Sequence, residues 1–137
     1  MATFFPSDEW IKLLMVDINN SSAYQDAAKN WEGDFHFIIE PGGTLDKTVI
    51  LYLDLWHGKC RQAYAVDGSD DGRKPAFRIK APVNHWKKVI TRQLDPLQAM
   101  MTGQLRLSGN MAAIMRHVRA AWELVECCTH IDTIFPV

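Results

Sequence analysis

The sequence lacks an excess of charge of either sign. Its 15 basic and 16 acidic residues leave a formal net charge of −1 over 137 residues. Proteins that bind nucleic acid or an anionic membrane through electrostatics carry a clear basic excess. We therefore expect no nucleic-acid partner and at most a transient contact with a membrane.

Long apolar runs and targeting patterns are also missing. No stretch approaches the ~20 apolar residues that a membrane-spanning helix needs. The start, MATFFPSDEW, has no basic segment and no apolar core of a signal peptide, and the end, TIFPV, is no peroxisomal or retention tripeptide. Cys60, Cys127 and Cys128 form neither a CxxC pair nor an even set for disulfides. These absences favour the cytoplasm.

Motifs for catalysis or metal binding are scarce. No HExxH pair and no zinc spacing of Cys and His occurs, so we expect no cofactor and no metal. The acidic GSDDG segment (68–72) lacks the spacing of a calcium loop and is typical of a solvated loop. Cys60 follows His57 by three positions, and Asp54 ends an apolar run, so a small enzyme using these groups is one hypothesis. A buried cysteine beside a turn, and a carboxylate paired with a basic neighbour, are simpler explanations.

The chain length and the apolar fraction of 47% predict one domain, residues 1–137, with a core over 7–128 and a tail over 129–137. Apolar spacing predicts helices near both ends of the core, capped by Ser7, Ser22, Asn84, Asp95 and Asn110. The second helix is expected to carry Trp31 and to end at Gly33, and the last to run unbroken from Met111 to Cys127.

Period-two alternation predicts the strands. Phe35, Phe37 and Ile39 share one face of DFHFIIE, and similar alternation marks TVILYLDLW, KCRQAYAV, AFRIKAP and QLRLS. His57-Gly58 is a plausible tight turn between two of them. A run of antiparallel strands between helices indicates an α+β fold with the helices stacked on one face of the sheet.

Methionines gather in one window, MMTGQLRLSGNMAAIM (100–115). Met100, Met101, Met111 and Met115 fit an ordinary core, but methionine also fills space that must adapt to different shapes. Because Gly103 and Gly109 bracket the short strand between them, this layer has little stiffness. A sheet floor, a methionine-rich side and several tryptophans can therefore enclose an apolar cavity.

The methionine-rich window is also part of a segment that resembles a known protein family. The segment DPLQAMMTGQLRLSGNMAAIMRHV resembles the C-terminal signature of the sterol carrier protein type 2 lipid-binding family. Met101-Thr102-Gly103, the strand Leu105-Arg106-Leu107 and Gly109-Asn110-Met111 carry it. The segments GDFHFIIEPGG and VILYLDLWHGKC are similar to the first hairpin strands of that family, and the likeness covers most of residues 7–128.

The resemblance implies a five-stranded, mostly antiparallel sheet with helices on one side and an apolar tunnel between the layers. It implies a non-catalytic carrier that binds a fatty acid, an acyl-CoA, a sterol or a similar apolar small molecule. We expect the tunnel lining to include Leu53, Met100, Met101, Leu105, Met111, Ile114, Met115, Val118 and Trp122.

Two alternatives to a carrier remain open. One is an accessory structural module of the same fold, with a filled core and a homodimer in place of a ligand. The other is the small enzyme above. The apolar tail residues Ile131, Ile134 and Phe135 need cover, either over the tunnel mouth or on a second subunit.

Overall fold

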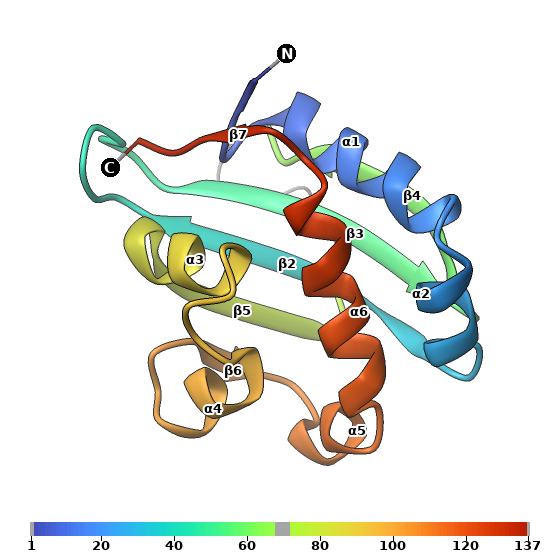
Figure 1. Ribbon diagram of the computed structural model, residues 1–137. Helices are drawn as coiled ribbons and strands as arrows, with labels where there is room; N and C mark the ends of the chain where they lie inside the picture. The colour runs from blue at the N-terminus through green and yellow to red at the C-terminus, as the bar shows by residue number, and fades with distance from the viewer. Residues whose placement is uncertain (1, 68–71, 137) are drawn as a thin grey trace.

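A five-stranded sheet with helices on one face forms the protein (Figure 1). The computed structural model describes residues 2–67 and 72–136, so most of the GSDDG loop lies outside the described residues. The strands of the sheet are β2 (Glu32–Glu40), β3 (Val49–Trp56), β4 (Lys59–Ala65), β5 (Phe77–Pro82) and β6 (Arg106–Ser108). The helices are α1 (Asp8–Asn19), α2 (Ser22–Ala27), α3 (Val83–Ile90), α4 (Pro96–Met101), α5 (Met111–Met115) and α6 (Val118–Thr129).

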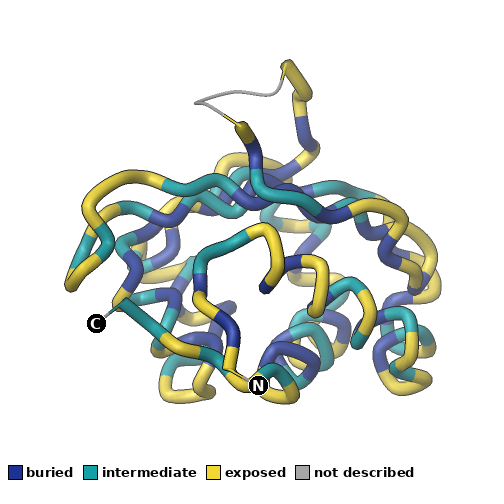
Figure 2. The backbone as a smooth tube through the Cα atoms, turned by 90° about the horizontal axis from the view of Figure 1, so that it is seen from above, coloured by how far each residue is buried: buried dark blue, intermediate teal, exposed yellow. Residues whose placement is uncertain are grey.

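The strands lie in the order β4-β3-β2-β5-β6. All neighbouring pairs are antiparallel except β2 and β5, which run parallel. The predicted α+β class, with a mostly antiparallel sheet of five strands, is confirmed. Viewed from above in Figure 2, the helices form one layer beside the sheet, and both layers contain buried stretches.

Alternation along the strands builds the core as predicted. Phe35 and Ile39 of β2 and Leu51, Leu53 and Leu55 of β3 are all buried, because these strands place every second side chain under the helices. The turn at His57-Gly58 joins β3 to β4, with positive φ at both residues. A Cβ at Gly58 would lie 2.7 Å from the carbonyl oxygen of Gln25, so glycine lets the hairpin pack against α2.

Side-chain caps start several helices where the sequence predicted. Ser7 accepts a hydrogen bond from the Trp10 amide, Asp95 caps α4 ahead of Pro96, and Asn110 caps α5. The predicted cap at Ser22 is wrong, because Ser21 occupies that position and accepts from the Tyr24 amide.

The predicted cap at Asn84 is also wrong. Pro82 holds the N-cap position of α3, with no side-chain cap, and Asn84 lies inside the helix. The expectation that the second helix reaches Gly33 is wrong too, because α2 ends at Ala27 and Gly33 belongs to β2. A Cβ at Gly33 would lie 2.7 Å from the Phe77 ring, so this glycine serves close packing within the sheet.

The last helix is broken, contrary to the prediction. In a continuous helix the Ala113 carbonyl would accept from the His117 amide, four residues on. Instead the His117 amide donates to Ile114 O at 2.9 Å, and the imidazole Nδ1 lies 2.9 Å from Ala113 O. The side chain has taken the carbonyl that the backbone would have used, so α5 ends at Met115 and α6 begins at Val118.

The two ends of the chain lie together. Strand β1 (Thr3–Phe4) pairs in parallel with β7 (Thr133–Ile134), and the Trp10 indole donates to Thr133 Oγ1 at 2.9 Å. Phe135 packs against Phe5, with ring centroids 5.7 Å apart. The N-terminal segment of the same chain therefore covers part of the tail, but Ile134 stays 39% exposed. Within the described residues, no helix is long and apolar enough to cross a membrane.

Candidate ligand-binding cavity

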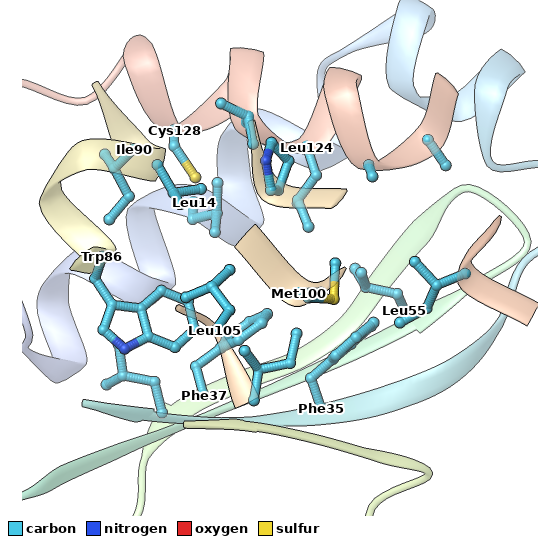
Figure 3. A pocket seen from close by; sticks show the side chains of 18 of the residues that line it. Leu14, Phe35, Phe37, Leu55, Trp86, Ile90, Met100, Leu105, Leu124 and Cys128 are labelled. Atoms are coloured by element: carbon cyan, nitrogen blue, oxygen red, sulfur yellow. The ribbon is translucent and has the colours of Figure 1, made fainter. Parts of the chain in front are cut away.

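An apolar cavity of about 120 Å³ lies between the sheet and the helices (Figure 3). Its sheet side is formed by Phe35, Phe37, Leu51, Leu55 and Ile79. Its helical side includes Leu14 of α1, Trp86 and Ile90 of α3, Met100 of α4, and Leu124 and Cys128 of α6. Among the described residues, no Lys, Arg, Asp or Glu lines it. The cavity therefore suits an apolar guest and offers no ion pair to a charged one.

The cavity is small for a lipid. A cavity of about 150 Å³ in another protein is dry and holds one benzene molecule. A volume of about 120 Å³ thus holds only a fragment of a long chain or of a fused ring system. A larger guest requires the lining to move apart.

Aromatic rings make the sheet side of the cavity stiff. Phe35 stacks on both Trp31 and Phe37, with centroids 5.8 and 5.3 Å away, and Trp86 meets Phe37 edge-on at 5.5 Å. The indole N–H groups donate to the protein, Trp31 to Gly33 O at 3.0 Å and Trp86 to Ala81 O at 3.1 Å. Their polar atoms are occupied, so the rings present apolar faces in fixed positions.

The helical side is less firmly built. Ala120 and Ala121 bring only methyl groups to the lining, and Met100 is an adaptable side chain. Exposed ion pairs tether α6 at its outer side, Arg92 to Glu126 at 2.6 Å and Arg119 to Asp26 at 3.0 Å. Pairs of this kind contribute little to stability. Widening of the cavity is therefore cheaper at α4 and α6 than at the sheet or at Trp86 of α3.

The structure brings only some of the predicted lining residues to the cavity. Met100, Leu105 and Ile114 line it. Leu53 is fully buried but is not part of the lining, and Met111, at the start of α5, is half-buried outside it. The side chains turned to solvent are Met101, Met115, Val118 and Trp122, with 70%, 44%, 36% and 38% of their surface exposed.

The choice of helical face accounts for Met115, Val118 and Trp122. These large apolar residues were predicted to face inward, but they lie on the neighbouring, more exposed face. The inner face is instead formed by Ala120, Ala121, Leu124, Val125 and Cys128. Ile114, Ala121, Leu124 and Cys128 recur at helical spacing, so this second face was also present in the sequence.

Several lining residues were missed although the sequence held a signal for them. Phe35 and Phe37 alternate within one strand, and Trp10 and Leu14 share a helical face, so each pair could have been assigned to the interior. Tyr24 also lines the cavity, and burial raises the pKa of its hydroxyl well above the ordinary value. The hydroxyl is therefore neutral and can only act as a hydrogen-bonding group.

The groups proposed for catalysis are not arranged as a nucleophile and base. Burial raises the pKa of the Cys60 thiol to about 12, the opposite of what an activated thiolate needs. His57 Nε2 lies 2.5 Å from Glu32 Oε2, and Asp54 accepts from Arg61 at 3.0 and 3.2 Å. Asp54 is thus paired with a basic neighbour. Among the described residues, no group of three or more His, Cys, Asp or Glu could hold a metal ion.

Comparison with known proteins gives consistent matches. Residues 12–121 match the SCP-2 sterol transfer family. A crystal structure of sterol carrier protein 2 is 36% identical, with a TM-score of 0.81, over 91% of this chain and 97% of that chain. A solution structure of a conserved hypothetical protein, possibly a sterol carrier protein, from Thermus thermophilus is also 36% identical, with a TM-score of 0.82, over 92% of this chain and 88% of that one.

A more distant likeness concerns part of a larger enzyme. A stereoselective inverting sec-alkylsulfatase from Pseudomonas sp. matches 95% of this chain with 17% of its own length, at 18% identity and a TM-score of 0.52. That likeness shows the fold alone. A search of curated proteins gave no match.

Proposed function

Since the chain belongs to the SCP-2 sterol transfer family, we propose that it is a non-catalytic carrier that holds a lipid or similar apolar molecule between its sheet and helices. The observation that carries the proposal is the apolar cavity with its stiff aromatic floor and adaptable helical roof. Of the residues predicted from the sequence, Met100, Leu105 and Ile114 are the proposed ligand contacts.

The energetics suit a carrier. Burying about 10 methylenes at about 0.8 kcal/mol each contributes about 8 kcal/mol, which corresponds to a dissociation constant of about 1 µM before association costs. Opening the small cavity costs free energy, and this cost lowers the net binding free energy. The result is a complex tight enough to hold a lipid and weak enough to release it.

Two properties of the chain support a place in the cytoplasm and a free carrier. Its cysteines are free and buried, and its net charge of −1 leaves no basic excess that would hold it on an anionic membrane. We propose only transient membrane contact, during loading and unloading. Phe135 needs no second subunit, because it packs on Phe5 of the same chain.

A structural module is the second candidate, favoured by the small volume of the cavity. A core this nearly filled could serve packing alone, as the fold does not by itself require a guest. Light scattering and a lipid-uptake assay together separate the two hypotheses. The module hypothesis predicts a stable dimer that takes up no lipid, and the carrier hypothesis predicts a monomer that does take up lipid.

Filling the cavity tests the carrier hypothesis. Ala121 lines the cavity, so Ala121→Phe places a ring inside it and should reduce uptake of a fluorescent fatty acid at least tenfold. Ala112→Phe is the matched control, because Ala112 is exposed on α5 and lies outside the lining. Equal uptake by both variants and the wild type would contradict ligand binding at this cavity.

A further inference from the structure

Four exposed apolar side chains lie on the outer side of the helices that enclose the cavity. This outer patch consists of Met101 of α4, Met115 of α5, and Val118 and Trp122 of α6. Figure 1 shows α4, α5 and the start of α6 at one end of the molecule, and α4 packs against α6. Large apolar side chains that are grouped on a surface mark a binding partner, whereas scattered single ones do not.

The outer patch is the reverse side of the cavity wall. Each of its residues directly follows a cavity-lining residue, in the pairs Met100-Met101, Ile114-Met115, His117-Val118 and Ala121-Trp122. These short helices therefore present apolar side chains both to the cavity and to water. A helix that is apolar on two faces is normally covered on both, so we expect a partner about one helix diameter, ~10 Å, from the ligand space.

The charges around the outer patch suit phosphate groups. Residues 96–122 contain no Asp or Glu and three arginines, Arg106, Arg116 and Arg119, all of them exposed. Arg106 and Arg119 each pair with one carboxylate, whereas Arg116 has no ion-pair partner among the described residues. The patch thus places one unpaired cation beside apolar side chains.

Other occupants and other surfaces fit less well. Four partly exposed side chains offer on the order of a few hundred Å², and a stable protein–protein interface needs about 800 Å² from each partner. Val16 of α1 is 54% exposed, but that helix carries three acidic residues, Asp8, Glu9 and Asp17, and one lysine. An anionic surface would repel α1 and would attract the outer patch.

We propose that the outer patch docks the protein on a phospholipid bilayer, with its apolar side chains among the upper acyl chains and Arg116 at the phosphates. The inference rests on the proposed carrier function and names the surface used for loading and unloading. Docking in this orientation turns α4 and α6, the less firmly built side of the cavity, toward the lipid. Because apolar contact drives it, docking needs no basic excess over the whole chain.

Trp122 is well suited to the boundary between head groups and acyl chains. Trp31 and Trp86 donate their indole N–H groups to backbone carbonyl oxygens. No such hydrogen bond holds the Trp122 indole among the described residues, and 38% of its surface is exposed. Its ring can therefore enter the acyl chains while its N–H meets the polar head groups.

Sedimentation with sucrose-loaded vesicles tests the docking surface. The vesicles are phosphatidylcholine, either pure or with one-fifth phosphatidylglycerol. Trp122→Glu and Met115→Glu should each lower vesicle affinity about tenfold, because each places a charge among acyl chains. Val16→Glu is the matched control and should bind like the wild type. An equal loss in the control, or a wild type that binds neither kind of vesicle, would overturn the inference.

Arg116→Gln tests the charge contact. It should lower affinity for the vesicles with phosphatidylglycerol about fivefold and affect pure phosphatidylcholine less. No loss on either lipid would overturn the assigned contact with phosphate.

Uptake and transfer of a fluorescent fatty acid separate docking from the carrier function. Uptake from aqueous solution should be unchanged in Trp122→Glu, because Trp122 lies outside the cavity lining. Transfer between donor and acceptor vesicles should slow about tenfold in the same variant, and its rate should no longer rise with acceptor concentration. Unchanged transfer in Trp122→Glu would overturn the docking surface and leave the carrier function standing. A wild type that binds vesicles but takes up no fatty acid would overturn the carrier function instead.

Discussion

Leu105→Ala should lower the free energy of unfolding by about 3–4 kcal/mol. Leu105 is 2% exposed, lines the cavity and donates its amide to Ala99 O at 3.0 Å, a contact that the substitution keeps. Removing its side chain adds empty space to a cavity that already measures about 120 Å³. Because the stiff aromatic floor cannot collapse into that space, the cost should not fall at the low end of the usual range.

The assay is urea and thermal unfolding of the ligand-free protein. For a domain of this size the melting temperature should drop by on the order of 10 °C. Leu107→Ala is the matched control: Leu107 lies in the same segment, pairs with Ile79 across β6 and β5, and is half-buried outside the lining. It should cost only about 1–2 kcal/mol. Equal costs for the two substitutions would refute the argument that the cavity wall cannot relax.

The stability of the same two variants can also be measured with an apolar ligand added. A ligand that binds only the folded state stabilises it by mass action. In Leu105→Ala the enlarged cavity should accept a bulkier guest, so a saturating apolar ligand should restore more stability there than in Leu107→Ala. Identical ligand-induced shifts in both variants would argue that the ligand binds elsewhere.

Three further predictions concern other parts of the fold. Gly58→Ala should cost more stability than Gly103→Ala in urea unfolding: both glycines have φ of +81°, but a Cβ at Gly58 meets Gln25 O at 2.7 Å, and one at Gly103 meets nothing within 4 Å. The Asp17 carboxylate accepts a hydrogen bond from the His130 ring and raises the pKa of His130, so the stabilising effect of this bond should be present below pH ~6.5 and fade as pH rises through the folded pKa. Asp17→Asn should therefore destabilise the protein more at pH 5.5 than at pH 8.5, and an NMR titration should show the His130 pKa falling. Burial raises the pKa of Cys60 to about 12, so iodoacetamide should alkylate this thiol only after unfolding, and rapid native labelling seen by mass spectrometry would contradict its burial.

Local patterns predicted the parts of the fold that local forces decide. The alternation of Phe35, Phe37 and Ile39 placed β2 and its buried face, and the short polar side chains of Ser7, Asp95 and Asn110 marked helix starts. Each of these depends on residues within a few positions of one another. Alternation also predicted all five strands of the sheet, and the run of strands between helices indicated the layering; the family resemblance implied the same arrangement.

Features that depend on distant residues were not predictable in the same way. The parallel pairing of β2 with β5 and of β1 with β7 joins segments far apart in the chain. The break at His117 depends on one imidazole that bonds a carbonyl the backbone would otherwise use. Of the predicted lining residues, Met100 lies beside the cavity, whereas Met101 and Trp122 lie at the surface.

The most direct test of a carrier is native mass spectrometry of the protein purified from cells without detergent, followed by extraction and identification of any bound molecule. A carrier should be recovered with a fraction of its molecules holding one apolar molecule, which is lost on unfolding and reduced in Ala121→Phe. A bare chain that also takes up no added fatty acid would contradict the carrier function.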